Sequence, residues 1–113
     1  MFKIRGGVAA ICGTIPLSLE LLAWVRGERK PETFPDSCRN TDECQVIAVI
    51  KGVVQGWTNT PYPAIYEDDF IAFGCGRDYA IAAMHCGKSA ADAVEIACIY
   101  ENGCGMGIDV MTP

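Results

Sequence analysis

The sequence predicts an α+β fold in which two groups of helices are separated by strands. Short apolar segments between glycine-containing turns indicate strands. Apolar and small residues recur at helical spacing early in the chain and again in its last third. The expected order is two strands, a helix, three strands, two helices and a final strand. This order suits either two sheet layers with helices outside or one sheet with helices on one face.

The first 27 residues predict a hairpin followed by a helix. The segments FKI (2–4) and VAAIC (8–12) flank a glycine-rich turn, which is typical of a hairpin. Thr14 suits a helix N-cap and Pro16 suits the first helical turn, whereas Gly27 ends the helix. The apolar face of this helix consists of Leu17, Leu21, Trp24 and Val25.

The middle of the chain predicts a loop, a second hairpin and a short strand. Residues 28–43 are polar and contain two prolines, so we expect a loop with one irregular turn at most. CQVIAVI (44–50) and VVQGW (53–57) form the hairpin around a Lys-Gly turn. Residues 58–69 are expected to be turns, and FIAF (70–73) is expected to be a strand buried on both faces.

The last third predicts two helices and a strand. A glycine-rich turn leads into a helix over 77–86, which Gly87 ends. Ser89 and Asp92 resemble a capping box with Asp in place of Glu, and they open a helix over 89–100. GIDVM (107–111) is the expected final strand. One face of the last helix consists of Ala90, Ala93, Val94, Ala97 and Cys98.

Length and charge limit the classes of protein. The chain has 113 residues, which fits a single domain over 1–113. Its net charge is −5 and its only locally basic stretch is RGERK, a solvated helix exit, which argues against a nucleic-acid surface. Pro16 and Glu20 interrupt the apolar stretch over 6–25, so we expect neither a signal peptide nor a membrane span. A cytoplasmic protein is the expectation.

Seven cysteines are present, an odd number, and most lie in apolar runs. Buried, reduced thiols in a cytosolic protein explain this pattern best. Cys38 and Cys44 are the nearest approach to a zinc motif and His85 is the only histidine, so we expect no metal and no cofactor. A thiol enzyme using Cys75 or Cys86 with His85 is an alternative, although adjacent helical side chains diverge by about 100° and Cys75 lies almost three turns away.

The segment FIAFGCGRDYAIAAMHCGKSAADAVEIA (70–97) resembles the late part of proteasome β-type subunits, most closely the bacterial HslV-type peptidase. VAAICGTIPLSLELLAWV (8–25) is similar to the strand, glycine turn and helix that follow the catalytic lysine of that family. QVIAVIKGVV (45–54) is similar to its central hairpin. The resemblance covers most of the chain and is weakest at 28–43 and 57–69.

This resemblance implies an αββα sandwich of the N-terminal-nucleophile hydrolase type. It implies a threonine-type endopeptidase in which the first residue of the mature chain attacks the peptide carbonyl and its α-amine acts as the base. It also implies a homo-oligomeric ring, a polypeptide substrate and a separate ATPase unfoldase, since the sequence holds no ATP-binding motif.

The resemblance assigns roles to a few residues. Gly13 matches the oxyanion glycine, whose backbone N–H is the useful group. Cys75, between the matching glycines Gly74 and Gly76, stands where the family has a serine that supports the nucleophile's amine, and a thiol is a weaker hydrogen-bonding partner. Glu101 and Cys104 align loosely with a second support pair. His85 has no role in the family, and Asp109 is expected to be a polar strand end.

The match begins after the family's nucleophile and catalytic lysine. The sequence starts at Met1, and Phe2 aligns just after the expected lysine. Thr14 is no substitute because the mechanism needs an α-amine on the same residue, and Lys3 is out of register. We therefore expect a truncated family member that is inactive as this chain and, because two core strands are missing, prone to associate. A non-catalytic ring or assembly protein of the same fold is the alternative.

Overall fold

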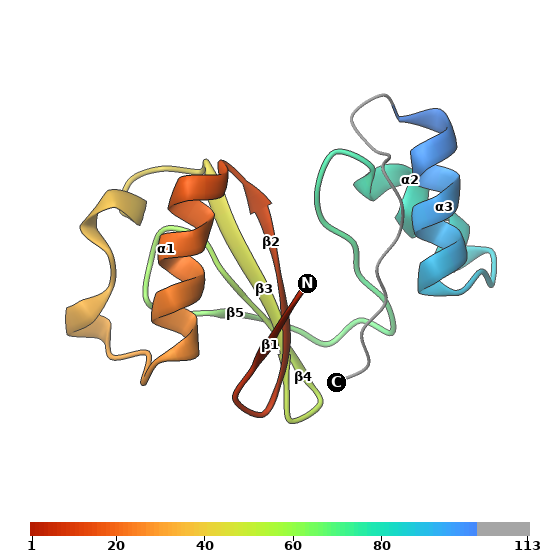
Figure 1. Cartoon of the computed structure of the whole chain (residues 1–113). Helices are drawn as coiled ribbons and strands as arrows, with labels where there is room; N and C mark the ends of the chain where they lie inside the picture. The colour runs from red at the N-terminus through yellow and green to blue at the C-terminus, as the bar shows by residue number, and fades with distance from the viewer. Residues whose placement is uncertain (102–113) are drawn as a thin grey trace. The chain divides into compact units, whose positions relative to one another are not determined.

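The computed structural model describes residues 1–101, which fall into two compact units (Figure 1). The first unit comprises Met1–Glu67, and the second begins at Asp68. The described residues hold five strands and three α-helices, as an α+β fold requires. None of the described helices is both long and apolar enough to cross a bilayer.

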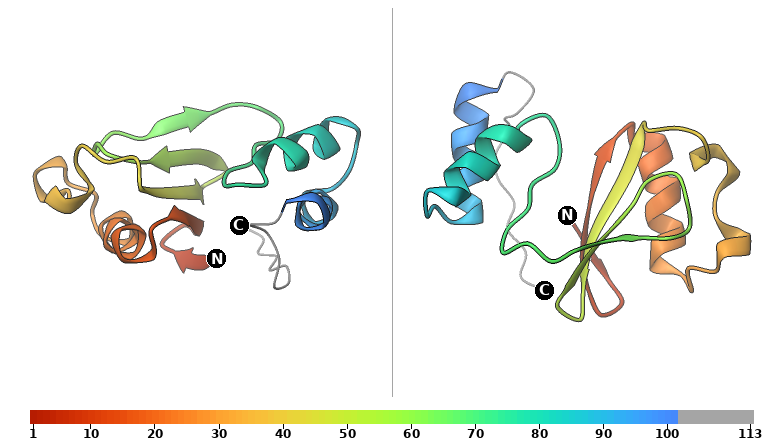
Figure 2. Two further views of the ribbon diagram at one scale, coloured as in Figure 1. Left: turned by 90° about the horizontal axis from the view of Figure 1, so that it is seen from above. Right: turned by 180° about the vertical axis from the view of Figure 1, so that it is seen from behind.

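The first unit is an antiparallel sheet with one helix on one face (Figures 1 and 2). Each strand pairs with the next one along the chain, so both predicted hairpins are confirmed. The helix α1 (Ile15–Arg26) packs on the central strands. The strands are β1 (Phe2–Ile4), β2 (Gly7–Gly13), β3 (Cys44–Ile50), β4 (Val53–Trp57) and β5 (Ala64–Tyr66).

The strand β5 corrects the expectation that residues 58–69 contain only turns. Ala64–Tyr66 pairs with β4, with Ala64 opposite Gly56. The two prolines before this strand suggest a loop, but proline is compatible with the entrance to an edge strand. Gly56 leaves room for the Tyr66 ring, because a Cβ at Gly56 would lie 3.1 Å from its Cε2 atom. Residues 64–66 thus form a strand because they pair with β4, and this pairing cannot be read from the local sequence.

Two 3₁₀ turns lie within residues 28–43, where we expected one irregular turn at most. They are η1 (Pro31–Thr33) and η2 (Asp36–Cys38), and a proline begins or immediately precedes each of them. The turns bring Phe34 back to the core, where its ring meets the Trp24 ring edge-on at a centroid distance of 5.1 Å. The loop is therefore part of the packed structure of the first unit.

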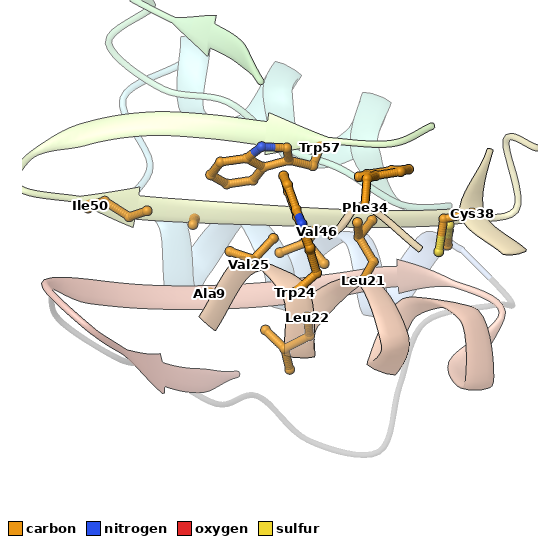
Figure 3. Close-up of a cluster of buried hydrophobic side chains, with 12 residues drawn as sticks. Ala9, Leu21, Leu22, Trp24, Val25, Phe34, Cys38, Val46, Ile50 and Trp57 are labelled. Carbon is orange, nitrogen blue, oxygen red and sulfur yellow. The ribbon is translucent and has the colours of Figure 1, made fainter. Parts of the chain in front are cut away.

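The core of the first unit lies between α1 and the sheet (Figure 3). Along β3 every second residue is buried, which identifies one face of the strand as the core face. Trp24 also meets Trp57 edge-on, at 6.3 Å between ring centroids. The predicted helical face is confirmed, with Leu17 at its half-buried margin. The fully buried side chains of this core include Leu21, Val25, Val46 and Trp57.

The second unit contains a helical hairpin of α2 (Arg77–His85) and α3 (Ala90–Tyr100), whose axes lie side by side in Figures 1 and 2. Ser89 is confirmed as the N-cap of α3, because the Asp92 backbone N–H donates to Ser89 Oγ at 3.2 Å, which is one of the two hydrogen bonds of a capping box. The predicted apolar face of α3 is confirmed only in part: Ala93 and Ala97 are buried, whereas Val94 is 42% exposed.

The predicted strand at residues 70–73 is wrong. These residues have no regular secondary structure and are half-buried. A continuous apolar run indicates burial, but a strand also requires a hydrogen-bonded neighbour, which local sequence does not reveal. The expected final strand over 107–111, including Asp109, lies outside the described residues, as does Cys104.

Candidate functional site

The predicted oxyanion residue, Gly13, ends β2 just before α1 begins. Its φ is +94°, and a Cβ there would lie 2.2 Å from the carbonyl oxygen of Glu43. Only glycine suits both the left-handed backbone and this close approach. The next backbone N–H, from Thr14, donates to the same Glu43 oxygen at 2.6 Å. The turn is thus held against the residue that precedes β3.

Ser18 holds the turn from inside the helix. Its side chain is fully buried, and its Oγ donates to the carbonyl oxygen of Cys12 at 2.8 Å. Its backbone N–H donates to the carbonyl oxygen of Thr14 at 2.9 Å. Thr14 itself is the N-cap by position, but its side chain makes no capping hydrogen bond. Sequence reasoning missed Ser18, although a serine among the apolar residues of α1 was a possible signal.

Two buried thiols lie beside the same turn. Cys44 is directly opposite Gly13 in the β2–β3 pairing, and Cys38 ends η2. The Cys38 thiol donates to the Leu17 carbonyl at 3.6 Å, and the Cys44 thiol donates to the Thr58 carbonyl at 3.8 Å. Burial, together with the neighbouring Cys38 thiol, raises the pKa of the Cys44 thiol from 9.0 to about 11.

The raised pKa predicts that the first unit loses stability at alkaline pH. The folded state keeps Cys44 protonated between pH 9 and pH 11, whereas the unfolded chain releases this proton. The contribution of Cys44 to the free energy of unfolding should therefore be fully present below pH 9. It should fall by on the order of 2 kcal/mol as the pH rises from 9 to 11.

Urea unfolding at several pH values checks this prediction. Cys44→Ala is the matched control, because it removes this titration and leaves every other alkaline group in place. We expect wild type to lose more stability than the variant across this range. Parallel pH profiles for the two proteins would contradict the prediction.

The second predicted site element is the glycine-rich turn before α2. The Arg77 N–H donates to the Gly74 carbonyl at 3.2 Å, and the Ala80 N–H donates to the Gly76 carbonyl at 3.0 Å. Gly74 has a φ of +101°, and Gly76 is the N-cap of α2. Cys75 is exposed at the tip of this turn. It belongs to the second unit, whereas Gly13 belongs to the first.

The second unit argues against a cysteine–histidine pair. His85 lines a hollow of about 440 Å³ together with Asp68, Asp69 and Arg77. Cys86 lines a different hollow, an apolar one of about 620 Å³. Cys75 lies just before the nine-residue α2 and His85 is its last residue, so roughly 12 Å of helix separates them. Among the described residues, no group of three or more possible ligands forms a metal site.

Glu101, the other support candidate that is described, is the half-buried C-cap of α3. Its N–H donates to the Ala97 carbonyl at 2.8 Å. Its predicted partner, Cys104, lies outside the described residues. The support pair therefore remains a prediction.

Comparison with solved structures identifies the fold. The structure of BPH from Thiobacillus denitrificans in complex with epoxomicin matches with a TM-score of 0.66 and 16% sequence identity. A second structure of Thiobacillus denitrificans BPH matches with a TM-score of 0.65 and 15% identity. The chain shares the fold of BPH. Each match covers 94% of this chain and 74% of the BPH chain, so residues of both units take part.

No protein-family model and no curated protein matches the sequence. At 15–16% identity, the likeness to BPH establishes a shared fold alone. The oxyanion role of Gly13 and the support role of Cys75 remain predictions.

Proposed function

We propose that this chain is part of a proteasome-like, HslV-type threonine endopeptidase subunit, built as an αββα sandwich of the N-terminal-nucleophile hydrolase type. The likeness to BPH is the observation that carries the proposal. One BPH structure holds epoxomicin, which is a proteasome inhibitor. The five-stranded sheet with α1 on one face is compatible with half of such a sandwich.

In this proposal the Gly13 turn supplies the oxyanion-binding N–H group. An oxyanion site is effective when its donors are held in place before the reaction begins. The contacts that support this role are the Thr14 hydrogen bond to Glu43 and the two hydrogen bonds of Ser18 across the turn. Cys75 would support the amine of the nucleophile through its thiol, a weaker partner than a serine hydroxyl.

The nucleophile and the catalytic lysine lie outside residues 1–113 in this proposal. A threonine acts as base and nucleophile together only when it carries a free α-amine. Every threonine in the printed sequence has its nitrogen in a peptide bond. The polypeptide 1–113 by itself is therefore expected to be inactive towards peptides.

Assembly belongs to the same proposal. We propose a cytoplasmic homo-oligomeric ring that degrades polypeptides delivered by a separate ATPase. Exposed apolar side chains at the end of α3 support association with further protein, since Ile99 and Tyr100 are 68% and 66% exposed.

Hydrolysis of short fluorogenic peptides tests the proposal. The polypeptide 1–113 and the product purified from the native gene are assayed side by side, with and without epoxomicin. We expect no turnover by 1–113 and epoxomicin-sensitive turnover by a native product whose mature chain begins with threonine. Intact mass and N-terminal sequencing of the native product accompany the assay.

Two outcomes count against this reading. Epoxomicin-sensitive turnover by 1–113 would contradict the expected inactivity. A native product that assembles into a ring, lacks an N-terminal threonine and hydrolyses nothing would favour the non-catalytic assembly protein instead. Native mass spectrometry measures the ring in either case.

A further inference from the structure

Cys38 and Cys44 form a buried pair of thiols in the first unit. Their side chains are 0% and 1% exposed, and both belong to the buried cluster of the first unit, where Figure 3 shows two sulfur atoms side by side. Cys38 is also one of the neighbouring groups that raise the pKa of Cys44. Cys38 lies at the edge of the apolar cluster in Figure 3. Cys12 lies next to Gly13, the residue that pairs with Cys44, but it is not a candidate partner for a disulfide with Cys44. Successive side chains of a strand face opposite sides of a sheet, so Cys12 and Cys44 lie on different faces.

We propose that Cys38 and Cys44 are a site of reversible oxidation, at which a low-molecular-weight disulfide converts the two thiols into an intrachain disulfide. This inference does not rest on the proposed peptidase function.

The chemistry balances with one molecule of the oxidant. The thiolate of one cysteine attacks a sulfur of the small disulfide, which forms a mixed disulfide and releases one small thiolate. The thiolate of the second cysteine then attacks the protein sulfur of that mixed disulfide and releases the other small thiolate. The two cysteine protons end on the two released thiols, so the protein loses two electrons and two protons.

Local opening of the loop between the two cysteines, residues 39–43, would expose both thiols to the oxidant. Four of the five residues of 39–43 are exposed, and Asn40 has a positive φ of 60°. The side-chain contacts of this loop lie at the protein surface: Arg39 forms an ion pair with Asp36, and the Asn59 side-chain amide donates to Asp42 Oδ1 at 3.4 Å. Local opening of such a segment needs less free energy than global unfolding. Oxidation therefore occurs in the open state of the loop and leaves α1 and the sheet folded.

The disulfide would act on the Gly13 turn. It would tie η2 to the first residue of β3, next to Glu43, whose carbonyl accepts the Thr14 N–H. Opening of the loop that releases Glu43 also frees this N–H, so a covalent link between Cys38 and Cys44 restricts that motion. Oxidised protein should therefore show slower hydrogen exchange at Thr14 than reduced protein.

Peptide mapping tests the pair directly. The folded chain is treated with oxidised glutathione, and free thiols are then blocked with N-ethylmaleimide before denaturation and digestion with trypsin. Cleavage after Arg39 separates the cysteines into peptides 30–39 and 40–51. We expect these two peptides to be joined by a disulfide that dithiothreitol releases.

Exposed cysteines provide the controls. Cys75 and Cys86 are exposed, so their mixed disulfides with glutathione report that the oxidant is active. The double variant Cys75→Ser/Cys86→Ser should keep the 30–39 to 40–51 link, whereas Cys38→Ser should lose it. Oxidation should raise the thermal midpoint of wild type by on the order of 5 °C and leave Cys38→Ser unchanged.

Peptides 30–39 and 40–51 that stay separate while Cys75 carries glutathione would overturn the proposal. A link from either peptide to a different cysteine would overturn it as well. Both outcomes come from wild-type protein, so they do not depend on whether a variant folds. Neither outcome bears on peptide hydrolysis, which is measured separately.

Discussion

Gly13→Ala is expected to destabilise the first unit by about 3 kcal/mol or more. The new Cβ would lie 2.2 Å from the Glu43 carbonyl oxygen, a backbone atom that cannot move without disturbing the start of β3. The residue would also keep a φ of +94°, a strained conformation for any L side chain. The clash and the strain act together, which places this change among the strongly destabilising substitutions.

Urea unfolding followed by tryptophan fluorescence measures this effect, because both tryptophans, Trp24 and Trp57, lie in the first unit. Gly52→Ala is the matched control. Gly52 also has a positive φ, of +80°, but a Cβ there would meet nothing within 4 Å, so only the backbone strain of about 1 kcal/mol is expected. Equal losses for the two variants would show that the contact with Glu43 does not constrain the turn.

Trp57→Ala is expected to cost about 3–5 kcal/mol, the range for removing a large aromatic side chain from a packed core. Trp57 is 2% exposed, and its ring meets Trp24 edge-on above the sheet (Figure 3). Trp57→Phe should cost only about 1 kcal/mol, because it keeps most of the ring contacts. It also deletes the indole N–H, which has no hydrogen-bond partner within the described part of the chain.

Thermal unfolding followed by circular dichroism measures both variants, and Tyr62→Ala is the control. Tyr62 is an aromatic residue of the same unit but is 70% exposed, so its loss should change stability by no more than about 0.5 kcal/mol. A cost for Trp57→Phe as large as that for Trp57→Ala would mean that the indole N–H does contribute a hydrogen bond.

Local patterns in the sequence determined most of the secondary structure. The β-rich runs CQVIAVI and VVQGW around the Lys51–Gly52 turn specify the second hairpin. Ser89 and Asp92 specify the start of α3 through a hydrogen bond between residues only three positions apart in the sequence. Gly13 was identified as a turn residue for the same reason: its requirement for a positive φ is a local property.

Only the tertiary structure decided which segments find a distant partner. The segment Ala64–Tyr66 is a strand because β4 accepts it, whereas the more apolar residues 70–73 form no strand. Ser18 acquires its place at the Gly13 turn, and Cys38 acquires Cys44 as its neighbour, only after α1 and the loop have packed on the sheet. Strand pairing and side-chain contacts of this kind depend on residues far apart in the chain, so local propensity does not predict them.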